Sequence, residues 1–125
     1  SHDELCDLAE WRSRGSNLRA VLHCISCYPS RMQDLRLQTI GMYDLDGFSD
    51  HSANVRVGGL AVACGAKMLE VHLKLFTTAQ CNPDYGHSLD PTQLKEYVGY
   101  AKEALGAISP PYRREIPMSA YRVRV

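Results

Sequence analysis

The sequence predicts an α/β fold in which helices alternate with the strands of a parallel sheet. Three apolar or alternating runs have the length and composition of strands. Segments whose apolar residues recur at helical spacing lie before, between and after these runs. The resulting order of helix, strand, helix, strand, helix, strand and helix is typical of βα units.

The first helix and the first strand are expected near the start of the chain. Residues 3–14 carry Leu5 and Leu8 at helical spacing, and Gly15 follows where a C-terminal cap belongs. Residues 18–26 (LRAVLHCIS) are apolar and short, so we expect a buried strand that ends before the turn residues Tyr28-Pro29-Ser30.

Two more helix and strand pairs follow. Apolar spacing predicts a helix over 32–42, and a short apolar segment over 45–49 is interpreted as a strand from its context. A helix over 53–64 is expected to end at Gly65. Residues 67–75 (KMLEVHLKL) then alternate apolar and polar side chains, as a strand does.

The last helix has the strongest start signal. Asp90 is a capping residue, Pro91 suits the first helical position, and Gln93 completes a capping box. Gly106 is expected to end this helix. The segment 109–125 is basic and interrupted by prolines, so we expect one folded unit over 1–108 and a linker-like tail.

Length and element order leave two architectures open. A chain of 125 residues, 45% of them hydrophobic, suits a single core. Three parallel strands do not close a barrel. The chain is therefore either a small open α/β layer or the rear part of a (β/α)8 barrel, whose usual length of about 250 residues is about twice this chain.

The overall composition argues against several classes of partner. The 14 basic and 14 acidic residues give a net charge of zero, unlike a nucleic-acid binder or a polybasic membrane anchor. No apolar run approaches the ~20 residues that span a bilayer, and the first residues do not resemble a secretory signal. We expect no nucleic-acid or membrane partner and a cytoplasmic location.

The five cysteines do not indicate a disulfide framework, because their number is odd and they are scattered. Cys24 and Cys27 form a C-x-x-C pair, but residues three apart in a strand point to opposite faces. We expect them to be reduced, buried thiols and not metal ligands.

The polar residues of the strand over 67–75 share one face. Alternation places Glu70 and His72 on that face, and Leu69 and Val71 on the other. In a barrel the apolar face lies under the helices, and the mixed face points inward to the functional site. Glu70 and His72 are therefore predicted to face that site.

The same alternation puts Ser49 and His51 on one face at the end of the preceding strand, with Asp50 turned away or toward the loop. His51 and His72 on neighbouring strands can share a metal, because imidazole suits Mn, Fe, Co or Zn, and two protein ligands leave positions for a substrate oxygen. The alternative is that each is a hydrogen-bonded structural histidine, the commoner role of a single histidine in a strand.

The other histidines are weaker candidates. His23 has the parity of Val21 and Ile25, so we expect a packed histidine of the core or of an interface. His87 lies in the loop that enters the last helix, where it can contact substrate. The role of His2 is left open.

Four segments, in order, resemble motifs of the sialic acid synthase family, whose members also make other nonulosonic acids. Residues 22–30 (LHCISCYPS) resemble the motif that begins Leu-His-Cys and ends Tyr-Pro-Ser/Thr. Residues 47–52 (GFSDHS) resemble Gly-Tyr-Ser-Asp-His-Thr, and 63–72 (ACGAKMLEVH) resemble Leu-Gly-Ala, two residues, Ile-Glu-Lys-His. Residues 82–98 (NPDYGHSLDPTQLKEYV) resemble Gly-Pro-Asp-His, two residues, Ser-Leu-Glu-Pro and the helix that follows.

The resemblance implies a partial (β/α)8 TIM barrel, roughly its last three strands with their helices. It also implies the family's reaction, in which phosphoenolpyruvate condenses with an N-acetylated amino sugar resembling N-acetylmannosamine to give a nonulosonic acid. A divalent metal, Mn2+ before Mg2+ or Co2+, would be held by His51 and His72.

Further roles are implied by the same resemblance. Glu70 and Asp84 are the candidate catalytic carboxylates, and Glu70 would orient His72 or the aldehyde, or else pair with Lys74 or another base. Substrate contacts are implied for four residues: Ser26 and Ser49 toward phosphoenolpyruvate, Tyr28 toward the sugar, and Asp84 toward sugar hydroxyls or metal-bound water.

The sequence also departs from the family pattern. Val71 replaces the lysine of Glu-Lys-His but points away from the site, and Ser26 stands where several members carry asparagine. The loop between His72 and Asp84 is a residue longer than the family pattern.

The family's first strands supply lysines that bind phosphoenolpyruvate, and the chain begins after them. We therefore expect self-association or support from an N-terminal half-barrel. Two alternatives remain: a catalytically inactive remnant or interaction module of this fold, and an unrelated two-histidine barrel enzyme.

Overall fold

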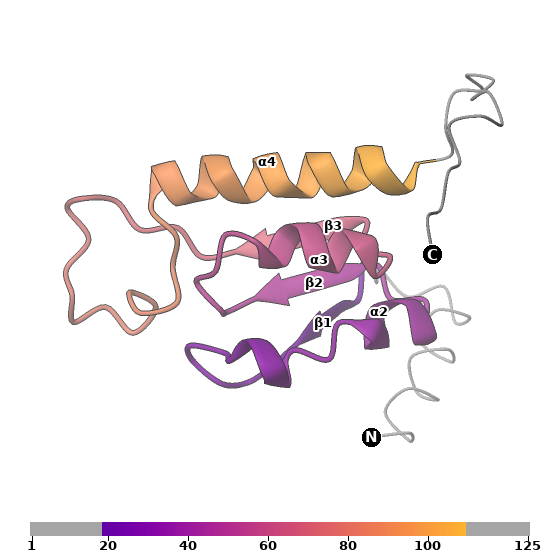
Figure 1. Cartoon of the computed structure of the whole chain (residues 1–125). Helices are drawn as coiled ribbons and strands as arrows, with labels where there is room; N and C mark the ends of the chain where they lie inside the picture. The colour runs from indigo at the N-terminus through magenta and orange to yellow at the C-terminus, as the bar shows by residue number, and fades with distance from the viewer. Residues whose placement is uncertain (1–18, 110–125) are drawn as a thin grey trace, which may run out of the picture.

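The computed structural model describes residues 19–109, in which a small parallel sheet is combined with helices (Figure 1). The strands are β1 (Leu22–Cys24), β2 (Gly47–Asp50) and β3 (Met68–Val71). They pair in the order β1-β2-β3, and both pairs are parallel. The predicted α/β class and the alternation of elements are confirmed within this range.

The helical elements follow the strands in the expected order. They are the 3-10 helix η1 (Met32–Asp34) and the helices α2 (Gln38–Met42), α3 (Val57–Ala63) and α4 (Pro91–Ile108). In Figure 1, α3 and α4 run side by side and in the direction opposite to the strands. The helix expected over 3–14 and the tail beyond residue 109 lie outside the described residues.

One face of the sheet packs on the helices and forms the core. The register aligns His23, Phe48 and Leu69 across the three strands on this face. Phe48 is 1% exposed, and Leu69 packs against the same cluster. The buried cluster consists of Leu35, Leu37, Ile40, Leu45, Phe48, Val57, Ala61, Ala66, Leu89 and Tyr97.

The other face of the sheet is open in the part of the chain that the structure describes. It carries Cys24, Ser49 and Glu70, which are aligned across the strands, and Met68, which is 49% exposed. The prediction that Cys24 and Cys27 are buried is wrong, since both are exposed free thiols. Cys24 lies on the face that the helices do not cover, and Cys27 lies in the loop after β1.

Several predicted boundaries are also wrong. β1 is shorter than the 18–26 segment, because among residues 19–109 it pairs with β2 alone and the pairing covers three residues. The helix expected over 32–42 is divided into η1 and α2 by Arg36, whose φ of 46° is left-handed. Gly106 does not end α4, which continues to Ile108, because Gly106 keeps a negative φ.

The start of α4 confirms the capping prediction. The Asp90 side chain accepts hydrogen bonds from the backbone N–H groups of Thr92 and Gln93. The Gln93 side chain in turn accepts one from the Asp90 N–H, which completes the capping box. Asp90 thereby fixes the point at which the loop after β3 becomes a helix.

A close approach of α3 and α4 depends on a glycine. A Cβ at Gly58 would lie 2.5 Å from the ring of Tyr97, which is 2% exposed and cannot move aside easily. We expect Gly58→Ala to lower the free energy of unfolding by about 1–3 kcal/mol, because overpacking displaces a buried ring. Urea unfolding measures this.

Gly99 on α4 is the matched control for that variant. A Cβ at Gly99 meets nothing within 4 Å, so Gly99→Ala should be neutral or should stabilise the helix by up to about 1 kcal/mol. Equal stabilities of the two variants would contradict the packing argument.

Within residues 19–109, the helices are too short or too polar to cross a membrane.

Candidate functional site

The carboxyl ends of β2 and β3 bring two histidines together. His51 directly follows β2, and His72 directly follows β3. Because neighbouring parallel strands end at the same edge of a sheet, the two imidazole rings lie with their centroids 5.2 Å apart. His51 is buried and His72 is half-buried. The strand parity predicts this meeting. Asp50 turns to the helix side, where it faces Tyr97, and this is one of the two orientations that the sequence leaves open.

Asp50 and Tyr97 form a buried pair outside the histidine cluster. Within the described residues, neither Asp50 Oδ2 nor the Tyr97 hydroxyl has a partner at standard hydrogen-bond geometry. Burial first, and then the nearby Asp50 carboxylate, raises the pKa of Tyr97 above its ordinary value. The other Asp50 oxygen accepts a hydrogen bond from the Ser52 N–H at 2.8 Å, which fixes the turn after His51.

Two carboxylates flank His72, one at each ring nitrogen. Glu70 Oε1 lies 3.9 Å from His72 Nε2, and Asp84 Oδ2 lies 3.5 Å from His72 Nδ1. Asp84 therefore reaches the site despite the longer loop that precedes it. A neutral imidazole has one N–H and one lone pair, so the two nitrogens of His72 have different roles in either tautomer.

Ser49 links the two strands at this edge. Its Oγ donates a 2.5 Å hydrogen bond to Glu70 Oε2 and lies 3.5 Å from His51 Nε2. The alternative that Glu70 pairs with Lys74 is wrong. Lys74 Nζ donates instead to the Tyr85 carbonyl at 3.1 Å and lies 4.4 Å from the centroid of the Tyr85 ring.

His87 is the member of the cluster that the sequence did not single out as a ligand. It is 4% exposed, and its ring centroid lies 4.7 Å from that of His72 and 5.4 Å from that of His51. Its buried Nε2 lies 3.4 Å from Asp84 Oδ1 but makes no hydrogen bond with the described residues. Burial, and then repulsion from His72, lowers the pKa of His87, which favours the neutral form of its ring.

Backbone hydrogen bonds hold the loop of Asp84 and His87 against the end of β3. The Leu89 N–H donates to the His72 carbonyl at 2.8 Å, and the Lys74 N–H donates to the Leu89 carbonyl at 2.9 Å. Leu73 and Leu89 thus form an isolated parallel bridge. This bridge brings His87 close to His72. In the sequence, the one hint that His87 would reach the site is its position in the loop just before the last helix.

The loop after β1 covers one side of the cluster. The Tyr28 ring lies 4.6 Å from the ring of His51 and 5.0 Å from that of His87, and it remains largely exposed. The Ser30 N–H donates to the His51 carbonyl at 2.9 Å, which ties this loop to the end of β2. Ser26 is exposed in the same loop, and no contact among the described residues joins its side chain to the cluster.

His23 has a structural role, as its parity predicts. Its Nε2 lies 2.8 Å from the Leu35 carbonyl oxygen, and its ring lies 5.7 Å from that of Phe48. It therefore points to the helix side of the sheet, away from the cluster. His2 lies outside the described residues.

The cluster contains two groups that fit a divalent metal. One is His51, Glu70 and His72, and the other is His72, Asp84 and His87. In each group the candidate ligand atoms lie within 4.8 Å of one another. Two imidazoles and one carboxylate suit Mn, Fe, Co or Zn. Metal–ligand bonds of about 2.0–2.2 Å require the atoms to approach a little further, by small side-chain movements.

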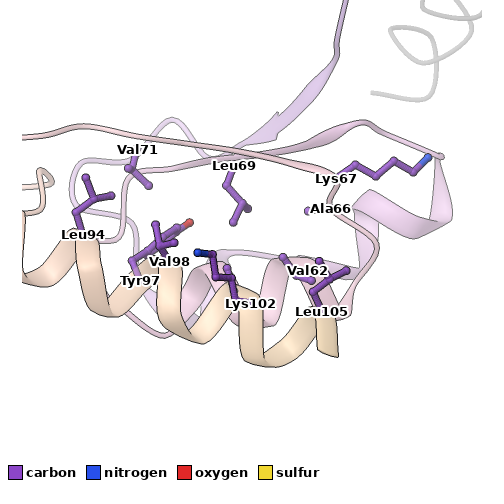
Figure 2. A pocket seen from close by; sticks show the side chains of 11 residues that line it. Val62, Ala66, Lys67, Leu69, Val71, Leu94, Tyr97, Val98, Lys102 and Leu105 are labelled. Carbon is purple, nitrogen blue, oxygen red and sulfur yellow. The ribbon is translucent and has the colours of Figure 1, made fainter. Parts of the chain in front are cut away.

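A cavity of about 500 Å³ lies on the other side of the sheet, between β3 and the helices (Figure 2). Leu69 and Val71 of β3 face Leu94 and Val98 of α4 across it. It has neither a histidine nor a carboxylate in its lining, so it lacks the chemistry of the cluster. Its full lining is Val62, Ala66, Lys67, Leu69, Val71, Leu94, Tyr97, Val98, Ala101, Lys102 and Leu105.

Comparison with known sequences identifies similar proteins. The model of the NeuB family matches residues 3–109. Human N-acetylneuraminate-9-phosphate synthase is 33% identical over 102 residues, which cover 77% of this chain and 28% of that protein. N,N'-diacetyllegionaminic acid synthase of Legionella pneumophila is 31% identical over 116 residues, which cover 80% of this chain and 32% of that protein. The chain spans about a third of the length of these curated relatives.

Two solved structures superpose on this chain over most of its length. N-acetylneuraminic acid synthetase of Leptospira borgpetersenii superposes with a TM-score of 0.71 at 26% identity, over 91% of this chain and 41% of that one. A spore coat polysaccharide biosynthesis protein E from Chromobacterium violaceum superposes with a TM-score of 0.75 at 22% identity, over 96% of this chain and 38% of that one. At 22% identity, the similarity to the Chromobacterium violaceum structure concerns the fold alone.

Proposed function

Because this chain belongs to the NeuB family, we propose that it is the C-terminal part of a (β/α)8 barrel that condenses phosphoenolpyruvate with an N-acetylated amino sugar. The product would be a sialic-type acid. The observation that carries this proposal is the convergence of His51, Glu70 and His72 at the carboxyl ends of β2 and β3. Barrel enzymes build their active sites at this edge.

A divalent metal held by His51 and His72 would polarise the sugar aldehyde. Mn2+ is the first choice, and Mg2+ or Co2+ are the alternatives. Mg2+ is less suited than Mn2+ because it prefers oxygen ligands to imidazole. Glu70 would join the two histidines as the carboxylate of the same group, and the hydrogen bond from Ser49 fixes the Glu70 carboxylate in place.

The surrounding side chains suit a sugar better than a phosphate. The exposed Tyr28 ring offers a wall for the sugar, and Asp84 can accept hydrogen bonds from its hydroxyls. The hydroxyls of Ser26 and Ser49 would bind phosphoenolpyruvate. The two candidate metal groups contain imidazoles and carboxylates but neither lysine nor arginine, so cationic side chains for the phosphate would come from another part of the barrel.

We also propose that another polypeptide unit covers the open parts of this chain. The exposed face of the sheet and the apolar cavity beside α4 support self-association or docking of an N-terminal half-barrel. The free thiols of Cys24, Cys27, Cys64 and Cys81 support a cytoplasmic location.

A complementation assay tests the reaction. The chain is mixed with a separately expressed N-terminal half of a full-length relative, and phosphoenolpyruvate consumption is followed with Mn2+ and several N-acetylated sugars. We expect turnover with the mixture and its loss, by at least ~100-fold, with His51→Ala. His23→Ala is the matched control and should keep the activity. An assembled, metal-loaded mixture without turnover would favour the inactive remnant or interaction module.

A further inference from the structure

We propose that His72, Asp84 and His87 form a second position for a divalent metal, beside the position at His51, Glu70 and His72 and exclusive with it. The two positions share His72, and each combines two imidazoles with one carboxylate. The inference deepens the proposed function and depends on it only for the presence of a metal in the cluster.

The environment of His87 supports a ligand role. The side chain is 4% exposed, and its Nε2 makes no hydrogen bond with any residue between 19 and 109, although it points into the cluster. A buried nitrogen without a partner costs free energy. A metal at this position would give Nε2 the partner that it lacks. The family motif that this segment resembles leaves the position of His87 open, so the role is not inherited from the resemblance.

Asp84 is placed between the two imidazoles. Its Oδ1 lies 3.4 Å from His87 Nε2, and its Oδ2 lies 3.5 Å from His72 Nδ1. The loop that presents it is fixed, since the Asp84 N–H donates to Asn82 Oδ1 at 2.9 Å and Ser88 Oγ donates to the Asp84 carbonyl at 2.6 Å. These bonds hold the backbone of Asp84, from which its carboxylate reaches both imidazoles and can complete a set of two histidines and one carboxylate, which suits Co2+, Fe2+ or Zn2+.

The two positions exclude one another because of His72. A neutral imidazole has a single lone pair, so His72 binds a metal through Nε2 or through Nδ1 but not through both. When Nε2 binds on the Glu70 side, the Nδ1–H can donate to Asp84. When Nδ1 binds with Asp84 and His87, the Nε2–H can donate to Glu70. The carboxylate that is not used as a ligand thereby orients the ring.

Co2+ titration of the full chain tests the inference, with the visible d–d absorption as the readout of affinity, stoichiometry and ligand geometry. The wild type should bind one equivalent. His51→Ala and His87→Ala should each bind one equivalent too, with affinities within about 100-fold of the wild type and with different spectra. The double variant His51→Ala/His87→Ala should lose at least a further ~100-fold, because each position then lacks a ligand.

Two results would overturn the inference. If His51→Ala binds Co2+ no better than the double variant while His87→Ala binds like the wild type, the second position does not exist and the metal of the proposed function remains. Two equivalents in the wild type would overturn the exclusivity. His87→Gln accompanies His87→Ala as a less disruptive variant, and thermal unfolding without metal separates a lost ligand from a lost fold. The reaction assay is not needed for either result.

Discussion

Replacing His72 by alanine is expected to lower the affinity of the chain for Mn2+ or Co2+ by at least ~100-fold, more than any other single substitution in the cluster. The reason is its place between Glu70 and Asp84, which makes it a member of both candidate metal groups. Loss of His51 or of His87 removes one group and leaves the other. Isothermal titration with each metal measures the effect.

His23→Ala is the control for this prediction. It removes an imidazole from the opposite face of the sheet, where His23 Nε2 contacts the Leu35 carbonyl. We expect it to lower the free energy of unfolding and to leave metal affinity unchanged. Metal binding by His72→Ala at the wild-type level, in a folded protein, would mean that the cluster is not a metal site.

The second large effect is expected at Phe48. This ring is 1% exposed at the centre of the core, between the middle strand and the helices. Phe48→Ala should lower the free energy of unfolding by about 3–5 kcal/mol, because the transfer free energy is lost and a cavity remains. Since domains of this size are stable by only about 5–15 kcal/mol, such a loss should be evident in urea unfolding followed by circular dichroism.

Phe76 is the matched control, because the same substitution is made where the ring is 92% exposed. Phe76→Ala should change the free energy of unfolding by less than about 0.5 kcal/mol. A similar loss for the two variants would show that Phe76 is covered in solution, by another copy or another segment. An unchanged stability of Phe48→Ala would contradict the described core.

Much of the site was predictable because strand alternation is a local property. The side chains of a strand point alternately to its two faces, so the residue order alone places Ser49 with His51 and Glu70 with His72. The same order turns Phe48 and Leu69 toward the helices, as the core confirms. The capping box at Asp90 is equally local, since its partners lie within one helical turn.

Other features depend on contacts that no local pattern contains. The division of the 32–42 segment at Arg36 and the exposure of Cys24 follow from where the helices pack, and not from propensity. A short apolar run predicts burial on both faces of a strand. In the described part of the chain, only the helix side of the sheet is covered.

The sequence by itself determined that His51 and His72 share one edge of a parallel sheet, because side-chain alternation and parallel order follow from backbone geometry. Only the tertiary structure decided that Asp84 and His87 join them. Their loop is held at the end of β3 by the hydrogen bonds of Leu89 with His72 and Lys74. Such bonds form between segments distant in sequence, and they turned a pair of histidines into a cluster of three with a carboxylate on either side of His72.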